Sequence, residues 1–266
     1  MERHKLEIER AALELRSQFK IESYGIHDIF SLVDKMNAYL IRIPIGKDTI
    51  CGFSTVFEGK KVIVSNSSEI LSREIFTIAH EIGHCIFDLD IDEQMLIVDQ
   101  EINSDTDEFI EKRADYFAAV LLLPEEQIRS YIRFELEKEA KNIRALDVIR
   151  IQIEFNASFA TIVKRLYEIE LISLTHKNKL YEERDSASSR KLFQAMNLSE
   201  DLIDSSDVLK VPNKYYEYVL SNYENGYVVF EKMKEALEIV GFDTDVIERI
   251  EPQEDDVDLD ELLEGF

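Results

Sequence analysis

The hydrophobic pattern divides the first part of the chain into two helices followed by short strands. Residues 2–20 and 27–37 carry apolar side chains at helical spacing. Three shorter runs alternate apolar and polar positions, as half-buried strands do: 38–43, 52–57 and 61–64. A glycine-containing turn at 58–60 separates the last two runs. We therefore expect a small three-stranded antiparallel sheet after the two helices.

The next periodic segment, residues 69–87, predicts a longer helix. Its core stripe is formed by Ile75, Ala79, Ile82 and Ile86, and the residues at 66–68 offer N-caps. Gly83 is unusual there, because glycine inside a helix costs about 1 kcal/mol relative to alanine. A close approach of backbone or substrate at this point would explain it.

His80 and His84 lie on one face of this helix, beside the core stripe. Residues four apart leave a helix in nearly the same direction, so the two imidazoles can hold one Zn²⁺ ion. Glu81 is turned by about 100° from the first histidine and can reach a water on the open side of the metal. The alternative is a pair of partly exposed histidines on an ordinary core helix.

A third zinc ligand is expected from Glu111, on a helix that Pro124 ends. Glu111 and Asp115 are four residues apart, on a face of small and apolar residues: Ala114, Ala118 and Leu122. Two carboxylates on such a face are costly to bury without a cation or a donor. A metal for Glu111 and an imidazole N–H for Asp115 would remove that cost.

Two alternatives for this third ligand stay open. Asp90 follows the histidine pair at a distance where some zinc sites place a ligand after a glycine turn. Here Phe87 holds the turn position, so the chain cannot easily double back. The two acids of the later helix could instead lie at the surface, paired with Lys112 or Arg113.

The chain resembles the ImmA/IrrE family of bacterial metallopeptidases. The resemblance is carried by three segments, 76–84, 111–119 and 121–124, and extends over about residues 10–175. It is most specific in the two segments that hold the metal-ligating candidates. The family often has Asn where this chain has Asp115, and the resemblance hardly reaches the acidic last third of the chain.

This resemblance implies a thermolysin-like core and a zinc-dependent endopeptidase. His80, His84 and Glu111 would bind Zn²⁺, Glu81 would act as general base, and Asp115 would orient a ligand histidine. Members typically cleave a helix-turn-helix repressor and so switch on mobile-element, stress or defence genes. Sequence offers three donors for the oxyanion and does not choose among them: Tyr116, Tyr39 and His176.

Beyond the metal-ligating segments the pattern is helical. Expected helices cover 125–141, 143–154, 158–169, 213–222, 228–240 and 243–250, with a linker at 184–190. The fold class is therefore α+β, with a mainly helical zincin-like core. We expect a metallopeptidase domain over 1–185, a small helical domain over 186–250 and an acidic tail over 251–266.

Charge and composition narrow the partners. The net charge is −24, from 55 acids against 31 bases, which repels phosphate backbones. The bases around 143–169 alternate with acids and do not form a phosphate-tracking face, so direct nucleic-acid binding is not expected. No apolar run reaches the roughly 18 residues of a membrane span, and the N-terminus has no secretory pattern, which predicts a cytoplasmic protein.

Two cysteines are too few for a disulfide framework. Cys85 follows Glu81 by one turn and is either a redox-sensitive thiol or a small buried side chain.

Two alternatives for the function of the chain also stay open. The chain could be a metal-bearing protein that holds a partner without cleaving it, or the peptidase toxin of a toxin–antitoxin or phage-defence pair.

Overall fold

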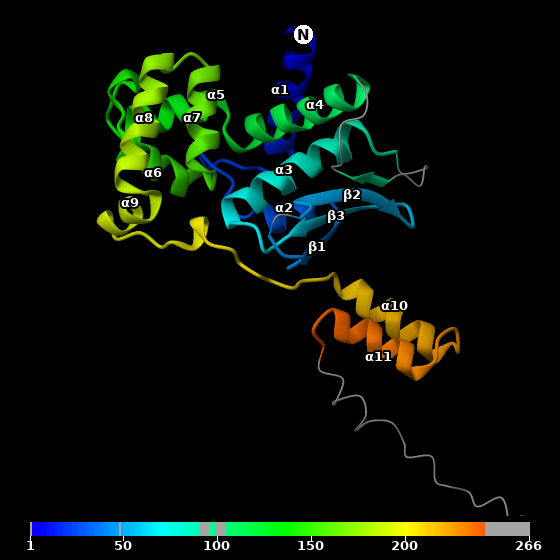
Figure 1. The fold of residues 1–266 in the computed structure, drawn as a ribbon. Coiled ribbons are helices and arrows are strands. Elements are labelled where there is room, and N and C mark those ends of the chain that lie inside the picture. The colour runs from blue at the N-terminus through cyan, green and yellow to red at the C-terminus, as the bar shows by residue number, and fades with distance from the viewer. Residues whose placement is uncertain (1, 48, 91–95, 99–104, 243–266) are drawn as a thin grey trace, which may run out of the picture. The chain divides into compact units, whose positions relative to one another are not determined.

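The computed structural model describes residues 2–47, 49–90, 96–98 and 105–242 (Figure 1). The helix expected over 243–250 and the acidic tail expected over 251–266 lie outside this part. The chain divides into two compact units, Met1–Lys210 and Val211–Phe266. The first unit contains the sheet and the metal-ligating candidates.

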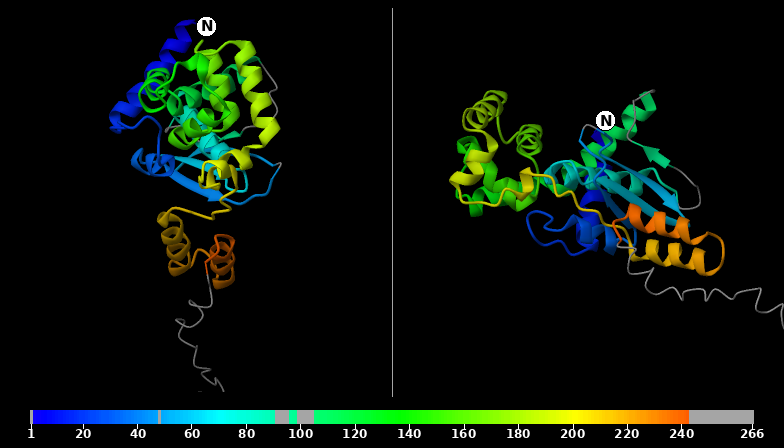
Figure 2. Two further views of the ribbon diagram at one scale, coloured as in Figure 1. Left: turned by 90° about the vertical axis from the view of Figure 1, so that its left-hand side faces the viewer. Right: turned by 60° about the horizontal axis from the view of Figure 1, so that its bottom comes forward.

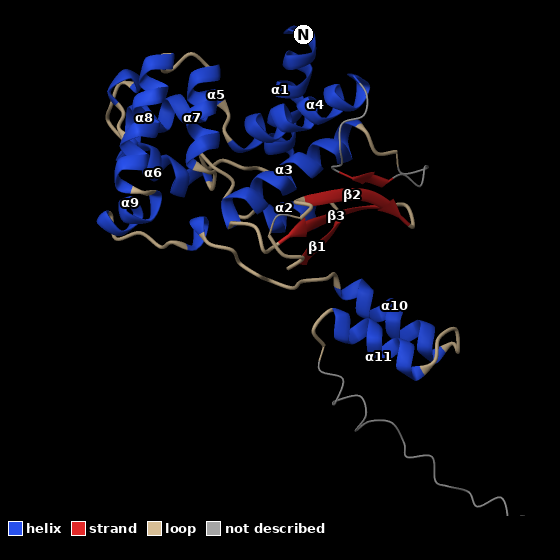
Figure 3. Ribbon diagram, viewed as in Figure 1, coloured by secondary structure: helices blue, strands red, loops and turns tan. Residues whose placement is uncertain are grey.

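The sheet of the first unit has four strands in the order β1-β3-β2-β4 (Figure 3). The strands are β1 (Tyr39–Ile43), β2 (Gly52–Phe57), β3 (Lys60–Asn66) and β4 (Leu96–Val98). The sheet is mixed, so the expectation of a purely antiparallel sheet is wrong: β1 runs parallel to β3, whereas β2 is antiparallel to both β3 and β4. The tight turn makes β2 and β3 a hairpin, and β1 pairs along the outer side of β3.

The turn of this hairpin shows why β2 and β3 pair. Glu58 and Gly59 both have positive φ, 49° and 71°, as a two-residue type I′ hairpin turn requires.

The fourth strand, β4, was not expected from the sequence. It has only three residues, too few to show an alternation of apolar and polar positions. Its pairing with β2 depends on the tertiary fold.

Helices make up most of the first unit, and the α+β class is confirmed. The helices are α1 (Glu2–Gln18), α2 (Ile29–Lys35), α3 (Leu71–Phe87), α4 (Asp105–Leu122), α5 (Glu125–Ser130), α6 (Ala145–Phe155), α7 (Phe159–Glu168), α8 (Leu174–Ala187) and α9 (Ser189–Ala195). α3 packs on β2 and β3 and, on its other side, against α4, which also contacts α1. The helices α6 to α9 form a separate group beside this layer (Figure 2).

One expected helix differs from the observed structure, and the helix pair that follows it is confirmed. The segment expected as one helix over 125–141 is α5 followed by a π-helical turn, Tyr131–Glu135, and a 3₁₀ turn, Ala140–Asn142. The pair expected over 143–169 is α6 and α7. Asn156 ends α6 in the left-handed conformation, at φ 51°, and the Ser158 hydroxyl caps α7 by accepting from the Thr161 backbone N–H.

α3 carries the two histidines expected to bind the metal, and it is fixed by packing on two sides. Ile75, Ala79 and Ile82 are buried, whereas Ile86, also expected in the core stripe, is 37% exposed. A Cβ on Gly83 would lie 3.2 Å from both Ala114 Cα and Phe117 Cδ1. Glycine therefore allows the close approach of α4, the helix that carries Glu111.

A buried ion pair fixes the first half of α3 to β1. Arg42 binds Glu74 through two parallel hydrogen bonds of 2.8 Å each. The Ser65 hydroxyl donates to the same carboxylate, and the Arg42 guanidinium lies 3.9 Å from the centre of the Phe30 ring. Ser206 accepts from Arg42 at 2.8 Å, so residues well beyond α9 take part in this network.

Residues 204–210 complete the first unit. The backbone N–H of Leu71, at the start of α3, donates to the Asp204 carbonyl at 2.8 Å. Arg42 and Lys210 exchange two backbone hydrogen bonds of 2.8 and 2.9 Å, so this segment covers the outer edge of β1. The backbone of β1 is thereby paired on its outer edge at Arg42.

The second unit contains a helical hairpin, α10 (Asn213–Glu224) and α11 (Phe230–Ile239). Met233 and Leu237 are buried between the two helices, and the Tyr215 hydroxyl donates to the Ala236 carbonyl at 2.9 Å. The expected domain boundaries at 185 and 250 stay predictions. In the described part of the chain no helix is long and apolar enough to cross a membrane.

Candidate metal centre

The three residues expected to bind zinc come together between α3 and α4. His80 Nε2 lies 2.9 Å from His84 Nε2 and 3.1 Å from Glu111 Oε2. The distance from His84 Nε2 to Glu111 Oε1 is 3.5 Å. One donor atom from each residue lies within 4.8 Å of the others. The two histidines come from one turn of α3, and the glutamate comes from the neighbouring helix.

This donor set suits a zinc ion. With bonds of about 2.0–2.1 Å in a tetrahedral arrangement, neighbouring ligand atoms lie about 3.3 Å apart. The three distances between the donor atoms fall on either side of this value. Two imidazoles and one carboxylate also leave a fourth position open, as catalytic zinc sites do.

Each histidine is oriented through its other ring nitrogen. Asp115 Oδ1 lies 3.0 Å from His80 Nδ1, and Asp88 Oδ2 lies 2.9 Å from His84 Nδ1. A carboxylate at Nδ1 keeps the proton there and leaves Nε2 for a metal. Asp115 lies beside a histidine as expected, but its side chain is 55% exposed, so the expected cost of burying it does not arise, and its proposed role stays a prediction. Asp88 was missed, yet its position four residues after His84 is a readable signal.

Asp88 is itself held by Arg113. The Arg113 guanidinium pairs with Asp88 Oδ1 and lies over the rings of Phe87 and Phe109, 5.1 and 5.5 Å from their centres. Arg113 belongs to α4 and lies two residues after Glu111. Glu111 and Arg113 therefore join α4 to α3 at two neighbouring points, one on each side of His84.

The pKa values of the centre show how strongly these groups interact. Burial lowers the pKa of His80, but the hydrogen bonds with Asp115 and Glu111 outweigh it and raise the pKa to about 10. Burial likewise lowers the pKa of His84, and the bonds with Asp88 and Glu111 raise it to about 9. Hydrogen bonds from both histidines lower the pKa of Glu111 to about 2. A bound cation would replace the protons in this arrangement.

Glu81 is the expected general base. Its side chain is 1% exposed, and its charge contributes to raising the pKa of both His80 and His84. It follows His80 directly on α3 and therefore points to a different side of the helix. Its catalytic role stays a prediction.

The other candidates from the sequence are not brought to the centre. Asp90 is exposed and does not belong to the donor cluster. Of the three expected oxyanion donors, Tyr116 donates to Glu9, and His176 Nε2 lies 2.9 Å from the Ile143 carbonyl. Tyr39 contacts the Lys60 ammonium, 4.8 Å from its ring centre.

Cys85 is a buried thiol and not a reactive one. Its side chain is 1% exposed, and burial raises its pKa to about 12, so it stays protonated at neutral pH. The interpretation of this cysteine as a small buried side chain agrees with both observations.

Metal-dependent peptidases commonly have two histidines one helical turn apart, a glutamate between them and a third ligand from another helix. The site between α3 and α4 has this arrangement. The model of one peptidase family, described as the IrrE N-terminal-like domain, matches residues 22–167, more than half of the chain. The chain belongs to this family, and the resemblance to ImmA/IrrE metallopeptidases is confirmed. Among curated proteins, none matches the chain.

Proposed function

We propose that this chain is a zinc-dependent endopeptidase of the cytoplasm that cleaves a helix-turn-helix repressor. The observation that carries the proposal is the cluster of His80, His84 and Glu111, with donor atoms within 4.8 Å of one another, next to a buried Glu81. Membership of a metallopeptidase family supports a protein substrate. The repressor is proposed because members of this family typically cleave such proteins.

In the proposed mechanism, His80, His84 and Glu111 hold the metal. When bound, Zn²⁺ supplies Lewis acidity toward the scissile carbonyl and toward the attacking water. Glu81 accepts the proton of that water and donates it to the nitrogen of the leaving amine. Asp115 and Asp88 keep the two imidazoles in the tautomer with a free Nε2.

Two alternatives share this centre and differ in what the protein does with it. A metal-bearing protein that only holds a partner would have no use for a general base, and the buried Glu81 beside the donor atoms favours the enzyme. A peptidase toxin of a toxin–antitoxin or phage-defence pair would use the same chemistry on a different target.

The test uses the helix-turn-helix protein encoded beside the gene for this chain. The zinc-loaded protein is incubated with this candidate substrate, with and without a chelator, and the products are identified by mass spectrometry. Chelator-sensitive cleavage supports the proposal. A stable complex without cleavage indicates the partner-holding protein, and growth arrest on expression of this chain alone indicates the toxin.

The first prediction concerns Glu81→Gln. This variant keeps the shape of the side chain but cannot accept a proton, so we expect unchanged zinc content and a cleavage rate lower by about 10²–10⁴-fold. Elemental analysis and a timed cleavage assay measure the two quantities. Glu126→Gln, an exposed glutamate of α5, is the matched control and should cleave as the unmodified protein does. Cleavage at the normal rate in the Glu81 variant would remove this residue from the mechanism.

A further inference from the structure

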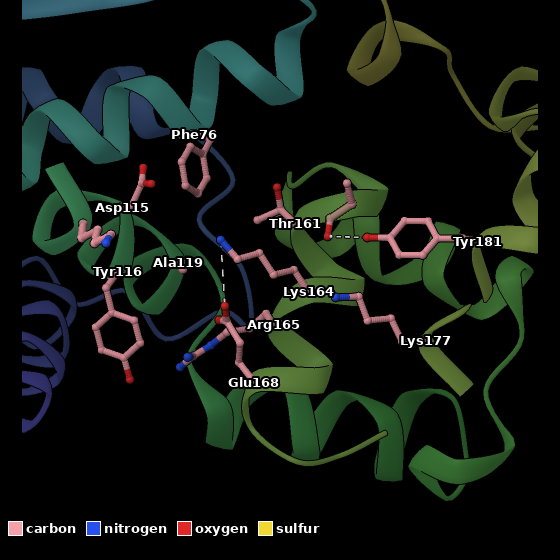
Figure 4. Close-up of a pocket in the computed structure, with 12 residues that line it drawn as sticks. Phe76, Asp115, Tyr116, Ala119, Thr161, Lys164, Arg165, Glu168, Lys177 and Tyr181 are labelled. Atoms are coloured by element: carbon pink, nitrogen blue, oxygen red, sulfur yellow. Dashed lines mark hydrogen bonds and ion pairs between the residues drawn. The ribbon is translucent and has the colours of Figure 1, made fainter. Parts of the chain in front are cut away.

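A pocket of about 410 Å³ lies between α4 and α7, next to the metal centre (Figure 4). Asp115 belongs to both: it lines the pocket, and its Oδ1 atom lies 3.0 Å from His80 Nδ1. Phe76, another lining residue, precedes His80 by one turn of α3. Asp115 thus connects the pocket to the centre, on the Nδ1 side of His80.

The lining combines apolar walls with an excess of positive charge. The walls are formed by Phe76, Tyr116, Ala119, Ala160 and Tyr181. The charged lining residues are four cations, Lys112, Lys164, Arg165 and Lys177, and two acids, Asp115 and Glu168. Such a lining would suit a side chain with an apolar stem and a negative end.

Both acids are already engaged with positive or donor groups. Asp115 is held by His80, and Glu168 Oε1 lies 3.9 Å from Lys164 Nζ. Lys177 Nζ lies above the ring of Tyr167, 5.0 Å from its centre. Figure 4 shows Lys164 reaching from α7 toward α4 and Lys177 reaching from α8 toward α7. A carboxylate that enters the pocket would have Lys164 and Lys177 among its lining residues and could take the place of Glu168 at Lys164.

The other two cations have structural roles. Arg165 is 3% exposed, and its Nε donates to the Leu123 carbonyl at 3.2 Å, so it supports the wall of the pocket. Lys112 pairs with Glu108, one turn earlier on α4. Lys164 on α7 and Lys177 on α8 are the two remaining cations of the lining, so we take them as the residues that determine which side chain is accepted.

The pocket has the opposite sign to the molecule as a whole. The chain carries a net charge of −24, which by itself would repel an acidic peptide. At physiological ionic strength exposed charges are screened over about 8 Å, so the potential inside the pocket depends mainly on its own lining residues. A local preference for acid is therefore compatible with the acidic surface.

We propose that this pocket is the substrate subsite that receives an acidic side chain near the scissile bond, with Lys164 and Lys177 as specificity-determining residues. The inference rests on the proposed peptidase function, since the pocket binds part of the substrate of the same centre. It names the chemical class of one substrate residue, Asp or Glu, at a fixed distance from the cleaved bond.

The test measures which peptide bonds the full-length protein cleaves. The zinc-loaded protein is incubated with a peptide library made by chymotrypsin digestion of a bacterial proteome, and the new ends are identified by mass spectrometry. The variants are Lys164→Glu, Lys177→Glu and, as a matched control on α8 outside the pocket, Lys179→Glu. Zinc content and melting temperature are measured for each variant, so that loss of folding is recognised.

We expect the unmodified protein and the control to favour Asp or Glu at one position near the cleaved bond. Each pocket variant should lower kcat/KM for a matched acidic peptide about 10- to 100-fold and raise it for the same peptide with Lys at that position. Chelator-sensitive cleavage without an acidic preference, or with a preference that both pocket variants retain, overturns the subsite and leaves the peptidase. Absence of chelator-sensitive cleavage, both of the library and of the neighbouring repressor, overturns the proposed function and the subsite with it.

Discussion

At the residue scale, the metal centre is a set of groups whose charges depend on one another. His80 and His84 lie between three carboxylates, one shared at Nε2 and one each at Nδ1. These contacts outweigh burial and hold the pKa of both imidazoles above the ordinary value of 6.5. A proton and Zn²⁺ therefore compete for the Nε2 atoms of this pair.

Proton release on zinc binding is the prediction at this scale. Below the pKa values of about 10 and 9, both imidazoles carry a proton that the metal displaces, so zinc affinity should rise with pH until these values are passed. Near pH 7.5 we expect zinc binding to release more protons than two imidazoles with ordinary pKa values would, measured by calorimetry in buffers of different ionisation enthalpy. Histidines with ordinary pKa values would release only a small fraction of a proton, and that result would contradict the prediction. Asp115→Asn should reduce the release, because it removes a contact that raises the pKa of His80.

At the element scale, catalytic geometry depends on how α3 and α4 pack. Gly83 lets the backbones approach, since a Cβ there would lie 3.2 Å from Ala114 Cα. Glu111 and Arg113 then reach α3 from α4, the first toward the histidine nitrogens and the second toward Asp88. The spacing of the two helices thus decides whether three donor atoms meet at one point.

The Arg113–Asp88 contact is testable by substitution. In Asp88→Asn the charge that holds the Nδ1 proton of His84 is lost, and in Arg113→Met the group that fixes Asp88 is lost. We expect zinc affinity to fall about 10- to 100-fold in each, with less effect when the second change is added to the first. Competition with a chromogenic chelator measures this affinity. Asp90→Asn, an exposed acid two residues away, is the control, and an equal loss in it would show that orientation of His84 is not the cause.

At the scale of the whole molecule, the first unit extends well beyond the segment that matches the family. The match ends at residue 167, whereas residues 204–210 pair with β1 and contact the start of α3. Ser206 also joins the buried Arg42–Glu74 pair. The part of the chain that folds around the metal centre therefore includes a segment that lies beyond α9.

Truncation tests this extent. A chain that ends at Lys210 should keep its zinc content and the unfolding free energy of the first unit, because the backbone hydrogen bonds of residues 204–210 are retained. A chain that ends at Ile203 loses these backbone hydrogen bonds, and we expect a loss of about 2–5 kcal/mol in urea unfolding of the first unit. Equal stability of the two shortened chains would show that the covering segment is dispensable. It would favour the expected boundary near residue 185.

The sequence determined what local geometry controls. Helical spacing places His80 and His84 on one face of α3 wherever that helix lies, and a positive-φ turn makes β2 and β3 a hairpin. The position of Asp88, one helical turn after His84, likewise follows from helical spacing. The resemblance to a family added the expectation that Glu111 supplies the third ligand.

Tertiary structure decided the contacts between segments far apart in the chain. The parallel pairing of β1 with β3, the closeness of α4 to Gly83 and the meeting of Arg113 with Asp88 leave no periodic trace in the sequence. The same holds for the lysines of α7 and α8 that face the pocket beside Asp115. Such contacts depend on the relative placement of whole helices and strands, which results from the packing of the entire core and not from any one segment.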